Sequence, residues 1–261
     1  TAKCYGLKHL GAISPGFQAD FVVLDNLQDL NVTDVFYKGK LVDRNAPIRV
    51  KTCGRALKHT VHLDKVKAEQ FVLPIGKKKT HVIGINPSQI TTEDLAVSLQ
   101  PAANYVPTDG YSKVAAVERH HNTGKIGVAV AKGYGIRNGA VASSVSHDSH
   151  NIIVIGDNDR DMALAVDEII RTQGGYTVVE NGEVFETLPL PIMGLMSDAG
   201  FESVNETLGR MIKKAHEMGV PADIEPFITL SFLALPVIPT LRITPRGLCL
   251  LTAKGPEILQ E

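Results

Sequence analysis

Cysteine and net charge are both scarce in this sequence. The three cysteines, Cys4, Cys53 and Cys249, are odd in number and far apart, which excludes a disulfide framework and the CxxC spacing of a zinc site. We expect them to be buried thiols of a cytoplasmic protein. The formal net charge of -1 leaves no broad basic field, so no nucleic-acid partner is expected.

Long hydrophobic runs are missing as well. The longest, around residues 227–238, contains Pro236 and is too short to cross a bilayer, so no membrane partner is expected. What remains is an ordinary globular composition, with 44% hydrophobic and 21% charged residues. A chain of 261 residues fits one large domain or two modest ones.

The first part of the chain shows the pattern of small β structure. Short apolar runs separated by glycine and aspartate lie at residues 21–24, 32–37 and 41–42. A polar, charged stretch at 43–58 follows, and we place a domain boundary in or just after it. The predicted domains are therefore residues 1–55 and 56–261.

The second part alternates between predicted strands and a few helices. A hairpin over 176–188 turns at Asn181-Gly182, Asn158 is the expected cap of one helix, and a second helix is expected at 204–218. Further strands are predicted at 80–85, 113–121, 126–131, 140–145 and 151–155. The pattern predicts the α+β class with a mixed sheet.

One polar cluster stands between two apolar strands. It consists of Ser146, His147, Asp148, Ser149, His150 and Asn151. A histidine beside an aspartate on a strand-end loop is suited to proton transfer or metal ligation, and the serines add hydroxyl donors. Such a loop is costly to bury without partners, which favours a functional site. A solvated polar loop is the alternative.

A second cluster, Glu118-Arg119-His120-His121, ends the predicted strand at 113–121. On a strand, Glu118 and His120 share one face, while Arg119 and His121 share the other. If the first face is core, a buried Glu118–His120 pair is a functional candidate with perturbed protonation. An exposed strand end beside the turn at 122–124 is the alternative.

The N-terminal segment resembles the amidohydrolase superfamily. The resemblance is carried by Gly11-Ala12-Ile13-Ser14-Pro15-Gly16, by Ala19-Asp20-Phe21-Val22-Val23-Leu24-Asp25, and by the later Lys38-Gly39-Lys40 turn. In that superfamily this segment follows a metal-binding barrel and enters a small β-sandwich. The resemblance therefore implies a β-sandwich segment followed by the mixed-sheet domain, and it is silent about substrate.

The rest of the chain is similar, in order, to the C-terminal domain of bacterial and archaeal adenine deaminases. The matching motifs are Val117-Glu118-Arg119-His120, Gly139-Ala140-Val141-Ala142, Ser146 to Asn151, and the stretch from Pro226 to Pro239. The implied reaction turns adenine and water into hypoxanthine and ammonia through a metal-activated hydroxide. A cytoplasmic homo-oligomer is implied as well.

A complete catalyst is not expected from this chain alone. It contains no H-x-H pair of the kind that binds metal in the barrel, and a barrel needs roughly 200 further residues. We expect the divalent metal, manganese or iron, to be bound mainly by a barrel in an N-terminal segment or a partner chain. Without that barrel the chain is expected to be inactive.

The resemblance and the clusters together assign the site residues. Catalysis is expected of His147, Asp148, His150 and Glu118, adenine binding of Ser146, Ser149 and Asn151, and an accessory metal at most of His120 and His121. Two rivals stay open. One is a related amidohydrolase that acts on another cyclic amidine or amide, and the other is a structural or oligomerisation domain whose histidines point to solvent.

Overall fold

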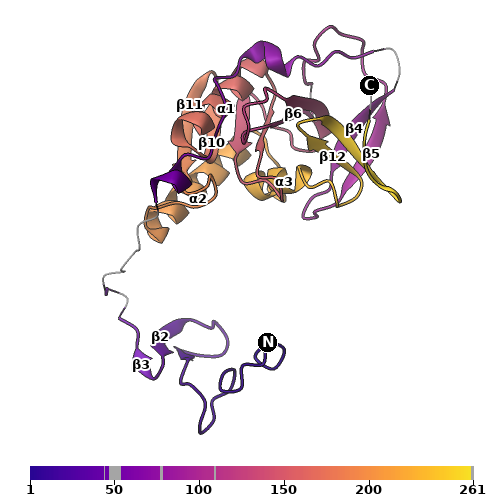
Figure 1. Cartoon of the computed structure of the whole chain (residues 1–261). Coiled ribbons are helices and arrows are strands. Elements are labelled where there is room, and N and C mark those ends of the chain that lie inside the picture. Colours follow the sequence, from indigo (N-terminus) through magenta and orange to yellow (C-terminus); the bar gives the residue numbers. More distant parts are fainter. Residues whose placement is uncertain (44, 47–53, 77–78, 109, 260–261) are drawn as a thin grey trace. The chain divides into compact units, whose positions relative to one another are not determined.

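The computed structural model describes residues 1–43, 45–46, 54–76, 79–108 and 110–259 (Figure 1). The chain divides into two compact units, Thr1–Thr52 and Cys53–Glu261. No helix within the described ranges is long and apolar enough to cross a membrane. Cys249 is buried as predicted, Cys4 is exposed against the prediction, and Cys53 lies outside the described residues.

The first unit holds a small antiparallel sheet. Its order is β1-β2-β3, with bounds β1 (Phe21–Leu24), β2 (Val32–Tyr37) and β3 (Lys40–Leu41). Phe21 and Phe36 are partners in the register, and their rings stack with centroids 4.7 Å apart. Many other apolar side chains are exposed, among them Ile13 at 89% and Leu27 at 86%. So small a sheet needs further packing partners for independent stability.

The second unit is built on a mixed sheet, which confirms the predicted α+β class. Among the described residues the sheet has eight strands in the order β11-β10-β8-β9-β6-β7-β4-β5. Neighbouring strands are antiparallel except β4 and β7, which are parallel. The strands are β4 (Thr80–Ile85), β5 (Thr92–Val97), β6 (Tyr111–Val117), β7 (Ile126–Lys132), β8 (Gly139–Ser143), β9 (Ile152–Gly156), β10 (Gly175–Glu180) and β11 (Glu183–Pro189).

Helices cover both faces of this sheet, which explains why its central strands are apolar throughout (Figure 1). The helix α1 (Asp159–Thr172) and the short 3-10 helix η2 (Ala68–Phe71) pack on the face that carries Ala115 and Val117 of β6. The helices α2 (Phe201–Glu217) and α3 (Pro226–Leu233) pack on the face that carries Val114 and Ala116. Successive residues of β6 therefore enter different core layers.

Several elements of this unit were not predicted, among them β5. The apolar run at 227–238 begins with α3, and a second small sheet follows it with the order β12-β13-β14. Its strands are β12 (Leu241–Thr244), β13 (Gly247–Thr252) and β14 (Gly255–Ile258), and a further 3-10 helix, η1 (Arg55–Lys58), opens the unit. Leu241 and Ile243 belong to the same core cluster as α2 and α3.

Strand pairing brings distant loops to one end of the large sheet. Val117 at the end of β6 pairs with Ile152 at the start of β9, and Ser143 at the end of β8 pairs with Ile153. Gly175 at the start of β10 pairs with the last residue of β11. The segments 118–125, 144–151 and 190–196 therefore all leave the sheet at the same end, which we call the loop end.

Candidate functional site

Both polar clusters lie at the loop end. β6 stops at Val117, so Glu118 to His121 form a turn and not the predicted strand continuation. The prediction that side chains alternate between two faces is therefore wrong beyond Val117. The prediction of a buried Glu118–His120 pair is wrong as well. Arg119 is the buried member at 2% exposure, His121 is exposed, and Glu118 and His120 are intermediate.

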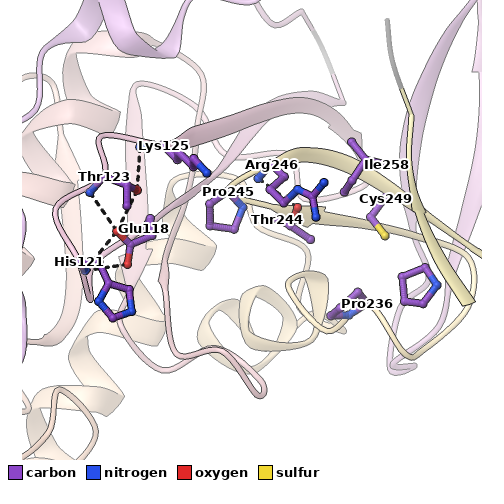
Figure 2. A pocket seen from close by; sticks show the side chains of 11 residues that line it. Glu118, His121, Thr123, Lys125, Pro236, Thr244, Pro245, Arg246, Cys249 and Ile258 are labelled. Carbon is purple, nitrogen blue, oxygen red and sulfur yellow. Dashed lines mark hydrogen bonds between the residues drawn. The ribbon is translucent and has the colours of Figure 1, made fainter.

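The Glu118 carboxylate is the reason that the chain turns here. It accepts a hydrogen bond from the backbone N–H of His120 at 2.5 Å. It also accepts from the backbone N–H of His121 at 3.0 Å, from Thr123 N at 3.2 Å and from Thr123 Oγ1 at 3.0 Å (Figure 2). Burial acts to raise the pKa of Glu118, but these hydrogen bonds outweigh it and hold the pKa below its usual value. The carboxylate is thus ionised at neutral pH and committed to its own loop.

A cavity of about 470 Å³ lies beside this turn. One side is formed by Glu118, His121 and Lys125, and the other by the C-terminal sheet with Pro245, Arg246 and Ile258 (Figure 2). None of the residues of the Ser146–Asn151 loop lines it. The predicted site residues therefore divide between the cavity side and the side of that loop.

The Ser146–Asn151 loop is held by its own polar groups. Ser146 is buried and its Oγ donates to the Asn151 carbonyl oxygen at 2.8 Å, while the His150 N–H donates to the Ser146 carbonyl oxygen at 2.7 Å. The Asn151 side-chain oxygen accepts from the Arg119 N–H at 3.3 Å. Ser146 and Asn151 thus shape the loop, and Ser149 is exposed.

His147 is positioned by α3. Its N–H donates to the Ser231 carbonyl oxygen at 3.1 Å, and its ring lies against Phe232 with centroids 4.8 Å apart. The ring stays 44% exposed, and its Nδ1 lies 3.6 Å from a carboxylate oxygen of Asp148, which is 85% exposed. The pair is close enough to interact electrostatically, and both side chains are open to a ligand.

His150 has a buried ring nitrogen. Its Nδ1 is buried and has no hydrogen-bond partner among the described residues. Burial lowers the pKa of His150, and the positive charges of Arg119 and His147 add to that effect against the opposing charge of Asp148. The ring is therefore neutral at neutral pH, with one nitrogen that lacks a partner in the described chain.

Arg119 was not predicted as a site residue, although it lies within the first cluster. Its Nε donates to the His150 carbonyl oxygen, its Nη1 to the Thr60 carbonyl oxygen at 3.0 Å, and its Nη2 to the Met193 carbonyl oxygen at 3.0 Å. The signal in the sequence that could have identified Arg119 is its position at the end of a strand, next to two polar loops. The alternation of side chains along a strand concealed this role, because it placed Arg119 on the face away from Glu118.

The described residues do not fit a metal centre. They contain no group of three or more His, Cys, Asp or Glu side chains arranged to hold an ion. The rings of His120 and His121 are 6.2 Å apart between centroids, and His120 Nε2 lies 2.8 Å from the Ser149 carbonyl oxygen. A carbonyl only accepts, so that nitrogen carries a proton and is not a free metal ligand.

Comparison with known proteins places the chain in a family. Residues 89–254 match the Adenine deaminase C-terminal domain, and residues 1–42 match the Amidohydrolase family. The adenine deaminase of Desulfitobacterium hafniense (strain Y51) is 51% identical over 95% of this chain and 44% of that protein. That of Nitratidesulfovibrio vulgaris (strain DP4) is 46% identical over 95% and 44%, and adenine deaminase 2 of Carboxydothermus hydrogenoformans is 41% identical over 95% and 45%. The chain thus spans under half the length of these relatives, and it belongs to the adenine deaminase C-terminal domain family.

Proposed function

We propose that this chain is the C-terminal part of a metal-dependent adenine deaminase, which converts adenine and water to hypoxanthine and ammonia in purine salvage. The observation that carries the proposal is the family match over residues 89–254, together with relatives named adenine deaminase that align with 95% of the chain. Because the chain spans 44% of the first of these relatives, the activity is proposed for the whole enzyme. The chain by itself is proposed to be inactive.

The proposed domain organisation follows the two family matches. Residues 1–55 are assigned to a β-sandwich that is completed elsewhere, and residues 56–261 to the C-terminal domain. The exposed apolar side chains of the first unit support this, because a larger sheet would cover them. An N-terminal barrel, a homo-oligomeric assembly and a cytoplasmic location are proposed on family likeness alone.

The divalent metal, manganese or iron, is assigned to that barrel. The described residues do not fit it, so no step through the metal is assigned to this chain, and His120 and His121 are assigned none. What this chain offers is a set of proton-handling and hydrogen-bonding groups. The amine that leaves the adenine ring must take up a proton, and a positioned side chain supplies one most readily.

The Ser146–Asn151 loop is the proposed contribution to the reaction. His147, Asp148 and His150 are proposed to move protons at the substrate, because the first two are open to a ligand and His150 Nδ1 lacks a partner within the described residues. Ser149 is proposed to hydrogen-bond adenine from its exposed position. Glu118, Ser146 and Asn151 act by shaping the loops, since their polar groups already bind the backbone around them.

The test uses an adenine deaminase that carries this chain. Such an enzyme is either the complete polypeptide or a chimera in which the chain replaces the matching region of the D. hafniense relative. His147→Ala and Asp148→Ala should each lower kcat for adenine, His147→Ala by about 10²-fold or more. His81→Ala is the matched control, because His81 also lies beside an aspartate, 2.9 Å from Asp94, and its side chain is 40% exposed on β4.

Two results would overturn the proposal. Activity on another cyclic amidine and not on adenine would agree with the superfamily but would rule out adenine as the substrate. Unchanged kcat and KM in both loop variants would favour the second candidate function, which is a structural or oligomerisation domain. Oligomeric state measured by light scattering on the same variants then shows whether the domain serves assembly.

A further inference from the structure

Arg119 is a buried cation without an anionic partner. Its side chain is 2% exposed, and within the described chain no carboxylate lies at ion-pair distance from it. Burial lowers its pKa to about 10, so the guanidinium stays charged at neutral pH. A buried charge is tolerated only when it is hydrogen-bonded, and here each side-chain nitrogen of Arg119 donates to a carbonyl oxygen.

These carbonyl oxygens come from three separate parts of the chain. Thr60 lies just after η1 in the second unit, His150 in the Ser146–Asn151 loop, and Met193 in the segment after β11. The planar guanidinium has donors in fixed directions, so it sets where the three backbones stand relative to one another. The backbone of Arg119 adds to this, because its carbonyl oxygen accepts from His62 N at 2.7 Å.

The segment around Met193 is fitted closely to the guanidinium. Gly194 has a φ of +71°, and a Cβ at that position would stand 2.8 Å from Arg119 Nη1. The Gly194 carbonyl oxygen also accepts from Ser144 Oγ at 2.6 Å, which ties this segment to the start of the β8–β9 connection. Met193 and Met196, which flank this glycine, are 43% and 51% exposed.

We infer that Arg119 is the positioning residue of the site and that it makes the Ile192–Met196 segment part of that site, on the same surface as His150. The claim that Arg119 affects catalysis rests on the proposed function. Arg119 touches no reacting atom in this scheme, because it acts through the backbone of His150. Met193 and Met196 then offer an apolar wall beside a polar loop, which is the composition of a site for a flat heterocycle.

The chain contains a matched control for this idea. Arg242 in β12 is 0% exposed, has a pKa that burial likewise lowers to about 10, and donates to the carbonyl oxygens of Ile238, Pro239 and Ile90. It is as deeply buried as Arg119 and also donates to carbonyl oxygens, although its Nη1 has no partner among the described residues. None of the residues that it binds belongs to the loop end.

The experiment compares Arg119→Met and Arg119→Lys with Arg242→Met and Arg242→Lys in the adenine deaminase that carries this chain. Both Met variants are expected to lower Tm. Arg119→Met should also lower kcat by about 10²-fold, because misplacement of a catalytic group by 1 Å has an effect of that size. Arg242→Met should leave kcat unchanged. Arg119→Lys keeps the charge but loses the fixed donor directions, so it should fold well and still lose most of kcat.

A spectroscopic arm on the 261-residue chain keeps the inference separate from the proposed function. The chain has five methionines, so methyl-labelled spectra are simple to assign. Arg119→Lys should shift the Met193 and Met196 methyl signals together with the His150 ring signals, and Arg242→Lys should shift neither. Loss of kcat in proportion to Tm in all four variants, or His150 signals that move without the methionines, would overturn the inference. An unmodified enzyme inactive on adenine would reject the proposed function alone.

Discussion

Two buried arginines of this domain differ in the residues that they bind. Arg119 and Arg242 are both almost fully buried, both have a pKa lowered to about 10, and both donate to carbonyl oxygens. The bonds of Arg119 cross 31, 59 and 74 residues of sequence, whereas those of Arg242 cross 3, 4 and 152. Arg242 Nη1 has no partner among the described residues, while every side-chain nitrogen of Arg119 donates. Burial therefore does not distinguish the two arginines, and the difference is that two acceptors of Arg119, the carbonyl oxygens of His150 and Met193, lie at the loop end.

The largest expected effect comes from combining Arg119 with His150. His150→Ala should lower kcat for adenine by about 10²–10⁴-fold if the ring transfers protons. Because Arg119 acts through His150, adding Arg119→Met to His150→Ala should lower kcat little further. Adding Arg242→Met should leave kcat unchanged in either background. If the fold decreases in kcat of Arg119→Met and His150→Ala multiply in the double variant, the two residues act independently.

The next effect concerns the glycine that lies against Arg119. Gly194→Ala places a Cβ 2.8 Å from the guanidinium at a positive φ, so we expect a loss of about 1–3 kcal/mol in the free energy of unfolding. Gly209→Ala in α2 is the counterpart, because nothing lies within 4 Å of its Cβ. It should stabilise the domain by about 0.5–1 kcal/mol. Urea titrations of the isolated chain measure both, and a stable Gly194→Ala would contradict the tight fit.

A smaller effect is expected at the turn that presents Arg119. Glu118→Gln keeps the shape but removes the charge that accepts three backbone N–H groups, and it should reduce stability by about 1–2 kcal/mol at neutral pH. The pKa of Glu118 is lower in the folded chain, so its contribution is present above the unfolded pKa and lost as pH falls below it. The difference between wild type and Glu118→Gln should therefore shrink in acid. A constant difference would contradict the assignment.

The smallest effect is the pH dependence that His150 gives to stability. Its folded pKa is lowered below 6.5, so the unfolded chain binds a proton more readily. Stability is full above about pH 6.5 and falls as pH drops through that value. Groups that face the ring are Arg119, His147, Asp148 and His120. Arg119→Met should raise the NMR-measured pKa of His150, and Arg242→Met should leave it unchanged.

Most of the large sheet and the helices α1 and α2 follow from local patterns in the sequence. The strand at 80–85, the Asn181-Gly182 turn and the capping of α1 by Asn158, which accepts from Asp161 N at 2.8 Å, are all as predicted. These features depend on neighbours within a few residues. The end of β6 was predicted too late, because the Glu118 carboxylate binds four donors in the turn and this overrides the two-residue alternation.

The polar clusters of the candidate site could be predicted from the sequence, whereas the contacts between them could not. The two clusters were visible as runs of polar residues, and the register of β6 with β9 explains their proximity. The contribution of the 192–196 segment was not visible, because it depends on bonds between residues 74 positions apart. The roles given to Glu118, Ser146 and Asn151 also changed, since only the folded chain shows that their polar groups already form hydrogen bonds.

The hairpin of β10 and β11 has one further consequence. Its Asn181-Gly182 turn closes the pair at the end of the sheet opposite the segments that leave at 118–125, 144–151 and 190–196. Both turn residues have positive φ, and Asn181 is exposed. A fluorescent tag or epitope inserted between them would sit at an exposed loop tip of the kind that accepts insertions. Such a tag would allow the association of this domain with a barrel to be measured without a change to the Ser146–Asn151 loop.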